Sequence, residues 1–265
     1  MRPTSIPFTW RGFTVLGLAL SLQACAASER ASTVHAPAPA HWTYEPPTGP
    51  DTWGTLDASY FAAAKGRAQS PIDISTTRAI EAGLPGLAFA TTAVPLRIVN
   101  NGHTVQVNCA AGNTLKFGDQ AYALQQFHFH SPSEHTLDGR HGAIEMHLVH
   151  KSADGQLAVV GVMIREGRDN PNFRPVWANL PTSKGPERAV PGVTIDPGSL
   201  LPADRGYFFY DGSLTTPPCS EGVRWFMLKS PLEMSGPQIA DFRKIHEGNN
   251  RPVQAHHARL VLRTP

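Results

Sequence analysis

Phe127-His128-Phe129-His130-Ser131 is the stretch of sequence from which the fold and the site can be predicted. Side chains two residues apart point to the same face of a β-strand, whereas they point to different sides of a helix. The alternation therefore predicts an extended strand in which His128 and His130 aim at one point while Phe127 and Phe129 turn into a core. Two converging imidazoles form an incomplete zinc site, because a catalytic zinc typically takes three protein ligands and keeps a position open for water.

A third ligand is expected from a neighbouring strand, and residues 144–150 offer one. Period two places Glu145 and His147 on one face, so His147 can reach the metal while Glu145 holds the far ring nitrogen of a ligand histidine. Gln126, on the face of the histidine pair, can orient another ligand. The alternative is chance, because the chain contains 12 histidines. Of the others, His150 is expected to pack on the opposite face, and His35, His41, His256 and His257 are expected to be exposed.

The composition favours a mainly β (α+β) fold, since 24 prolines and 23 glycines imply frequent turns. We expect a single domain around a large, mostly antiparallel, twisted central sheet with a few short peripheral helices. A helix is predicted from the Ser235 cap to Gly248, and a shorter one over 173–180. Strands are predicted over 96–99, 104–108, 122–130 and 144–150, over 157–164 (buried on both faces) and 223–229, and over 259–263 at a sheet edge.

Three segments are distinguished along the chain. Residues 1–24 contain a short apolar run after Arg2 and Arg11 and are predicted to be a signal peptide, either of the ordinary kind or of the lipoprotein kind that leaves lipidated Cys25 as a membrane anchor. Residues 25–40 are predicted to be a flexible tether and 41–265 the catalytic domain. The expected location is periplasmic or secreted, with outer-membrane anchoring as the lipoprotein variant.

The charge balance argues against nucleic acid as a partner. The formal net charge of the whole chain is +2, and residues 1–24 hold two arginines and no acidic residue. Removal of that segment leaves a formal charge of about zero, whereas proteins that bind nucleic acids usually carry a basic surface.

Beyond the histidines, the chain closely resembles the α-class carbonic anhydrases of the bacterial secreted or periplasmic type, roughly over residues 41–263. The resemblance implies that His128, His130 and His147 bind Zn2+, and that zinc-bound hydroxide attacks CO2 to give bicarbonate and a proton. The blocks that carry the resemblance are Gln69-Ser70-Pro71-Ile72-Asp73-Ile74, Asn100-Asn101-Gly102-His103, Gln126-Phe127-His128-Phe129-His130, Ser133-Glu134-His135-Thr136, Glu145-Met146-His147-Leu148-Val149-His150, Gly212-Ser213-Leu214-Thr215-Thr216-Pro217-Pro218 and Asn249-Asn250-Arg251-Pro252.

The resemblance also implies roles around the metal. Thr215 accepts the hydroxide's proton in a hydrogen bond and donates its own to ionised Glu134, which can only accept. His103 is the proton shuttle, because a histidine titrates near neutral pH. Glu145, Gln126 and Asn249 support the ligands. Thr215 and Thr216 contact substrate together with an apolar wall of Val149, Val159, Leu214, Val223 and Trp225, and Asn101, Gln106 and Tyr44 order water.

Some features depart from the family pattern or stay open. Cys219 is present, but the cysteine that secreted bacterial relatives place near Ala63 is absent, so the usual disulfide is not expected. A Cys109–Cys219 bond would be unusual, and a free Cys219 thiol is the alternative. The expected substrates are CO2 and bicarbonate, and the chain is a monomer or a homodimer. The rival functions are a non-catalytic binding module of the same family and a zinc esterase.

Overall fold

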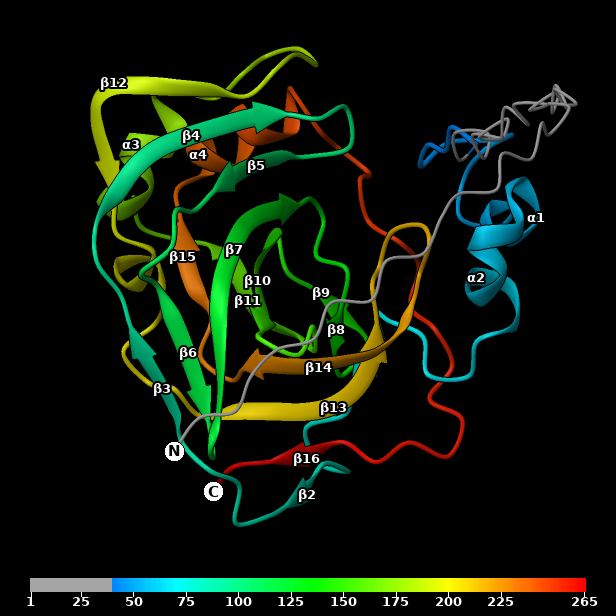
Figure 1. The fold of residues 1–265 in the computed structure, drawn as a ribbon. Helices are drawn as coiled ribbons and strands as arrows, with labels where there is room; N and C mark the ends of the chain where they lie inside the picture. The colour runs from blue at the N-terminus through cyan, green and yellow to red at the C-terminus, as the bar shows by residue number, and fades with distance from the viewer. Residues whose placement is uncertain (1–39) are drawn as a thin grey trace, which may run out of the picture. The chain divides into compact units, whose positions relative to one another are not determined.

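A large sheet runs through the part of the chain that the computed structural model describes, residues 40–265, which belongs to one compact unit (Figure 1). The predicted signal peptide, the Cys25 anchor and the tether up to residue 39 lie outside the described residues. Among the described helices, none is long and apolar enough to cross a membrane.

The main sheet confirms the predicted fold class. Most of its strand pairs are antiparallel, and the exceptions are parallel pairs of β11 with β14 and β15 and of β16 with β2. In spatial order its strands are β12 (Arg188–Ile195), β4 (Val94–Asn100), β5 (Val105–Asn108), β7 (Gln120–His130), β10 (Ile144–Ser152), β11 (Leu157–Glu166), β14 (Glu221–Leu228), β13 (Tyr207–Ser213), β16 (Leu262–Arg263) and β2 (Ile80–Glu81).

Shorter strands complete the β-structure. β15 (Leu232–Met234) pairs with β11, and β6 (Thr114–Phe117) joins β7 to β3 (Leu87–Ala90). A separate small sheet consists of β1 (Asp73–Ile74), β8 (Thr136–Leu137) and β9 (Arg140–His141). The predicted strand over 259–263 shrinks to the two residues of β16, and β2 lies outside it, so the prediction of an edge strand there was wrong.

β7 and β10 lie side by side at the middle of the sheet and place the histidines. Their antiparallel register sets His147 opposite His128 and Glu145 opposite His130. The pairing shifts between Val149 and His150, and this irregularity leaves Gln125 of β7 without an opposite residue. The alternation that we predicted over 122–130 is therefore interrupted by a β-bulge, which changes the face of the residues that precede it.

The bulge has a clear effect on packing. Without it, Tyr122 and Leu124 would share a face with His128. With it, they join Phe127 and Phe129 in the larger apolar core on the other side of the sheet. A smaller apolar cluster covers the opposite face around Val159, Val223 and Trp225. β11 is buried over most of its length on both faces, as its continuous apolar run predicted.

Helices are short. α4 begins as predicted at the Ser235 cap, where Ser235 and Gln238 form a capping box, but it ends at Arg243 rather than at Gly248. The helix predicted over 173–180 is shorter and consists of a 3-10 turn and α3. The helical segments are α1 (Trp53–Leu56), η1 (Ala58–Tyr60), α2 (Phe61–Lys65), η2 (Pro171–Phe173), α3 (Arg174–Trp177), η3 (Pro197–Leu200) and α4 (Gly236–Arg243).

Candidate metal centre

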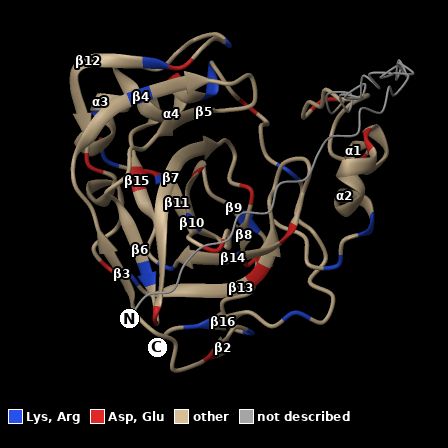
Figure 2. Ribbon diagram, in the orientation of Figure 1, with Lys and Arg blue, Asp and Glu red and all other residues tan. Residues whose placement is uncertain are grey.

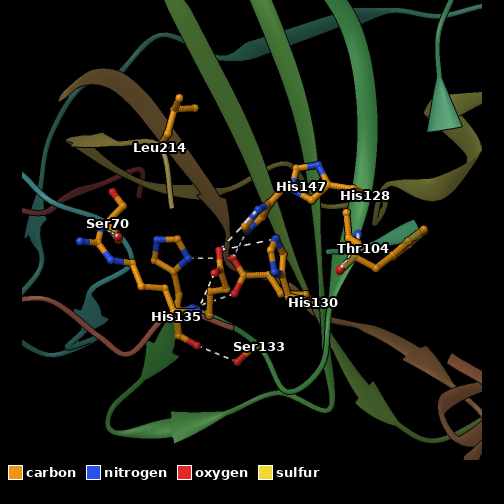
Figure 3. A network of polar contacts seen from close by, with 12 residues as sticks. Ser70, Thr104, His128, His130, Ser133, His135, His147 and Leu214 are labelled. Atoms are coloured by element: carbon orange, nitrogen blue, oxygen red, sulfur yellow. Dashed lines mark hydrogen bonds and ion pairs between the residues drawn. The ribbon is translucent and has the colours of Figure 1, made fainter. Parts of the chain in front are cut away.

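His128, His130 and His147 converge as the strand pattern predicted. One ring nitrogen from each lies within 4.8 Å of the others. Figure 3 shows the three rings on neighbouring strands, two from β7 and one from β10. His130 and His147 are buried and His128 is half-buried. The pairing of β7 with β10 thus brings together residues that the sequence separates by up to 19 positions.

The far ring nitrogen of each histidine is held by an oxygen. His128 Nδ1 donates to Gln126 Oε1 at 2.8 Å, and His147 Nε2 donates to Glu145 Oε1 at 2.7 Å. His130 Nδ1 donates to the backbone carbonyl of Asn249 at 2.7 Å. Because a neutral imidazole carries one proton, these bonds leave His128 Nε2, His130 Nε2 and His147 Nδ1 as lone-pair donors toward the common point.

The environment favours the neutral form of the His128 and His130 rings. Burial lowers the pKa of His128 well below its usual value of 6.5, with His130 and His147 adding to the effect. Burial also lowers the pKa of His130, although Glu134 acts in the opposite direction. Neutral imidazole is the form that binds a metal ion. The lowered pKa values therefore leave unprotonated ring nitrogens available as ligands.

Glu145 belongs to a longer buried chain of hydrogen bonds. Its Oε1 also contacts His135 Nδ1 at 2.7 Å, and its Oε2 accepts from the His135 amide at 2.8 Å. His135 Nε2 lies 2.6 Å from the Tyr210 hydroxyl, which lies 2.8 Å from Ser70 Oγ. Burial acts to raise the pKa of Glu145, but His135 and His147 hold it well below its usual range. The ionised carboxylate therefore fixes the His147 ring from behind.

Glu134 is fully buried beside the same point. Its Oε1 accepts from the amide of Arg251 at 2.9 Å. Its Oε2 lies 3.6 Å from His130 Nε2 and 3.9 Å from His147 Nδ1 and has no hydrogen-bond partner. The predicted hydrogen bond from the Thr215 hydroxyl is therefore not formed in this structure, although Thr215 is buried with 5% of its surface exposed. The Arg251 amide, which we did not predict, uses the oxygen that faces away from the histidines.

A cavity of about 120 Å³ opens onto His128 and His130. This volume exceeds the roughly 10–15 Å³ that one water needs. Four of its lining residues are those to which the resemblance assigns proton transfer or water ordering: His103, Asn101, Gln106 and Tyr44. The remaining lining residues are Trp42, Thr104, Gln126 and Thr216.

His103 sits at the cavity under an aromatic cover. Its ring is stacked on Trp42, with centroids 3.8 Å apart and planes 13° from parallel. Burial lowers the pKa of His103 below 6.5, and nearby His41 and Lys184 add to this effect. The Asn101 side chain accepts from the amides of His103 and Thr104 at 2.9 and 3.0 Å and fixes the turn.

The predicted apolar wall forms one cluster. Val159, Val223 and Trp225 are buried in the smaller apolar core, and Val149 and Leu214 pack against it half-buried. None of the five is among the residues that line the 120 Å³ cavity, most of which carry polar side chains. The two cysteines in the described residues, Cys109 and Cys219, are both free and form no bond with each other.

The site fits a zinc ion. Two buried polar atoms near the common point, His130 Nε2 and Glu134 Oε2, have no hydrogen-bond partner. Buried polar atoms are rarely left unpaired, and such exceptions often mark an ion or a water. Three neutral imidazole nitrogens with oriented far nitrogens are a donor set typical of catalytic zinc.

Comparisons with known proteins also point to a family of metal-dependent enzymes. Residues 48–264 match the family described as eukaryotic-type carbonic anhydrase. A carbonic anhydrase of Pectobacterium atrosepticum is 40% identical over 246 residues, which cover 92% of this chain and 97% of the relative. The solved α-carbonic anhydrase of Thermovibrio ammonificans in complex with sulfanilamide is 43% identical with a TM-score of 0.81, over 84% of this chain and 99% of that one. Dioscorin complexed with ascorbate is 32% identical with a TM-score of 0.78, over 84% and 97%.

Proposed function

This chain belongs to the α-type carbonic anhydrase family, and from that premise we propose that it catalyses the reversible hydration of CO2 to bicarbonate and a proton, with Zn2+ held by His128, His130 and His147. The observation that carries the proposal is the arrangement of these rings. Each presents an unprotonated nitrogen to one point, and each has its other nitrogen fixed by an oxygen acceptor. Three protein ligands leave a position open for chemistry.

Zinc bound there supplies a Lewis acid that lowers the pKa of a water to about 7, a value for which carbonic anhydrase is itself the reference case. The protein contributes the orientation of the ligands. Gln126, Glu145 and the Asn249 carbonyl hold the rings so that little rearrangement is needed when the metal binds.

Glu134 and Thr215 are proposed to select the orientation of the reacting group. The buried Glu134 Oε2 is free to accept one hydrogen bond beside the ligand nitrogens. An ionised carboxylate can only accept, so a threonine hydroxyl that donates to it must itself accept from the group on its other side. This role requires a hydrogen bond from the Thr215 hydroxyl to Glu134 Oε2, the atom that has no partner in this structure.

His103 is proposed to carry the proton away. It lines the same cavity as His128 and Thr216 without being one of the three ligands. Because its pKa is lowered, the ring is mostly neutral at pH 7 and ready to accept a proton from water in the cavity.

The size of the site favours a small substrate. A cavity of about 120 Å³ suits CO2 and water, whereas a zinc esterase needs room for a larger acyl group. We propose that CO2, which carries no net charge and gains from apolar surroundings, also contacts the apolar cluster, whose members lie outside the lining of this cavity: Val149, Val159, Leu214, Val223 and Trp225.

The non-catalytic alternative is less well supported. The similarity to dioscorin shows that this fold also occurs in a protein solved with ascorbate. Here, however, all three histidines are present with their supporting acceptors, an arrangement that a pure binding module does not require.

The first prediction tests the activity. Zinc-loaded protein is expected to hydrate CO2 in a stopped-flow assay, and an aromatic sulfonamide such as sulfanilamide is expected to inhibit it, because a solved relative was crystallised with that inhibitor. Protein that binds zinc with a native circular dichroism spectrum yet shows no hydration above the buffer rate would rule out the enzyme.

Export is a separate proposal, supported only by the apolar run after Arg11 and by the small residues before Cys25. We propose a periplasmic or secreted enzyme, with the lipidated form anchored to the outer membrane through Cys25. Mass spectrometry of the membrane fraction distinguishes a lipidated Cys25 from an ordinary cleaved N-terminus.

A further inference from the structure

We propose that Glu187, acting through Asn108, is a positioning residue that fixes the Gln106 amide with its carbonyl oxygen toward the cavity beside His128. The inference rests on the proposed function, since it concerns the polar wall along which the proton leaves. Neither the family resemblance nor the ligand geometry assigns Glu187 or Asn108 a role.

These residues form a row that runs across β4, β5 and β7 of the main sheet and ends at Glu187, just before the neighbouring strand β12 (Figure 1). Gln106 and Asn108 are two apart on β5 and share a face. The register sets Gln106 opposite His128 and Asn108 opposite Gln126, the residue that holds His128. Glu187 immediately precedes β12 and reaches Asn108 from the far side.

Each hydrogen bond in this row is donated toward Glu187. Gln106 Nε2 donates to Asn108 Oδ1 at 2.6 Å, and Asn108 Nδ2 donates to Glu187 Oε2. The second carboxylate oxygen, Glu187 Oε1, pairs with Arg97. Because an ionised carboxylate can only accept, Asn108 must turn its NH2 group toward Glu187 and its oxygen toward Gln106.

The same constraint fixes which atom of the Gln106 amide faces the cavity. Gln106 must then use its NH2 group on Asn108, and its Oε1 is the atom left for the cavity that Gln106 lines with His103 and His128. An acceptor at this place binds a water molecule through one of the water's hydrogens. The lone pairs of the water oxygen then remain available to hydrogen-bond donors elsewhere in the cavity. Without the Glu187 carboxylate, the side-chain amides of Asn108 and Gln106 can both flip. Gln106 can then present either its NH2 group or its oxygen to the cavity.

The second prediction is that Glu187→Gln slows proton removal but not the chemistry at CO2. In weak buffer, kcat is expected to fall about fivefold, since a net hydrogen bond changes a population by roughly that factor. The ratio kcat/KM, which does not depend on the proton leaving for buffer, is expected to stay unchanged, and imidazole is expected to restore kcat.

Glu233→Gln is the matched control. Glu233 is as exposed as Glu187, with 25% of each side chain accessible, and it also pairs with arginines, but on the far side of β11 at β15. It is expected to leave both kcat and kcat/KM at wild-type values. An equal fall of kcat in both variants, or a parallel fall of kcat/KM in Glu187→Gln, would show a general structural effect and overturn the proposal.

A measurement on the metal-free protein is independent of activity. In the NMR spectrum, the side-chain NH2 resonances of Asn108 and Gln106 are expected to shift in Glu187→Gln and to remain in place in Glu233→Gln. Unshifted resonances would show that Glu187 does not fix the orientation of the two side-chain amides. This result would overturn the proposal whether or not the variant is active. An inactive wild-type enzyme would instead count against the proposed function, so the two failures are distinguishable.

Discussion

In the proposed mechanism the proton leaves through one side chain, His103. The ring lies at the cavity, stacked on Trp42, and its pKa is lowered by burial. A neutral ring accepts a proton, whereas a protonated ring cannot. Turnover that relies on His103 should therefore fall as the pH drops through its pKa, below the usual value of about 6.5.

The third prediction is that His103→Ala lowers kcat in weak buffer by about 10- to 100-fold, at or below the low end of what a positioned acid–base group contributes. Added imidazole is expected to restore the rate, because it replaces the missing base. His257→Ala, which removes an exposed histidine, serves as the control. A variant that imidazole does not rescue would show that His103 is not the proton carrier.

Some site residues could be predicted from the sequence and others could not. Period two was enough to place His128 with His130 and Glu145 with His147, because a strand has only two faces. Contacts between segments far apart in the sequence carry no such periodicity. The Arg251 amide reaches Glu134 over 117 positions, and Tyr210 reaches His135 over 75. No local sequence pattern predicts these hydrogen bonds.

Among the strands, the positions of the elements were easier to predict than their ends and irregularities. The apolar run of β11 and the alternation of β10 identified two central strands. The bulge at Gln125 was missed, because it depends on the pairing of β7 with β10 rather than on either strand alone. α4 ends early, at Arg243, and the chain beyond it makes a tertiary contact, in which the Gly248 amide donates to the Ser131 carbonyl at 2.7 Å.

β13 supports the metal site through a close approach at Gly212. A Cβ atom there would fall on Ser70 Oγ and lie 2.7 Å from Tyr210 and 2.9 Å from Trp225. Ser70 and Tyr210 belong to the chain of hydrogen bonds that ends at Glu145 and His147. The strand therefore needs a glycine to let this chain form.

The fourth prediction is that Gly212→Ala lowers the free energy of unfolding by about 1–3 kcal/mol, the usual cost of overpacking a core. Zinc affinity should fall as well, since Glu145 loses part of its support. Urea unfolding and a zinc competition titration measure the two effects. Gly86→Ala, where an added Cβ meets nothing within 4 Å, is the control. Equal stability of both variants would contradict this account of β13.

At the scale of the molecule, one sheet organises both the site and the path out of it. β7 and β10 supply the three converging histidines, β5 supplies Gln106 to the cavity wall, and the 249–251 segment contacts His130 and Glu134. Acidic and basic residues are interspersed along the described ribbon (Figure 2). The centre is assembled from strands of one sheet and from the 249–251 segment outside it.

The central claim is that His128, His130 and His147 hold a zinc ion, and the fifth prediction, on metal content, tests it most directly. Zinc is measured in the wild type, in His147→Ala and in His150→Gln. His150 is also a buried β10 histidine, but its Nδ1 donates to the Leu148 carbonyl, away from the site. We expect about one zinc ion per chain in the wild type and in His150→Gln, and little in His147→Ala. Full zinc content in a folded His147→Ala protein would contradict the account.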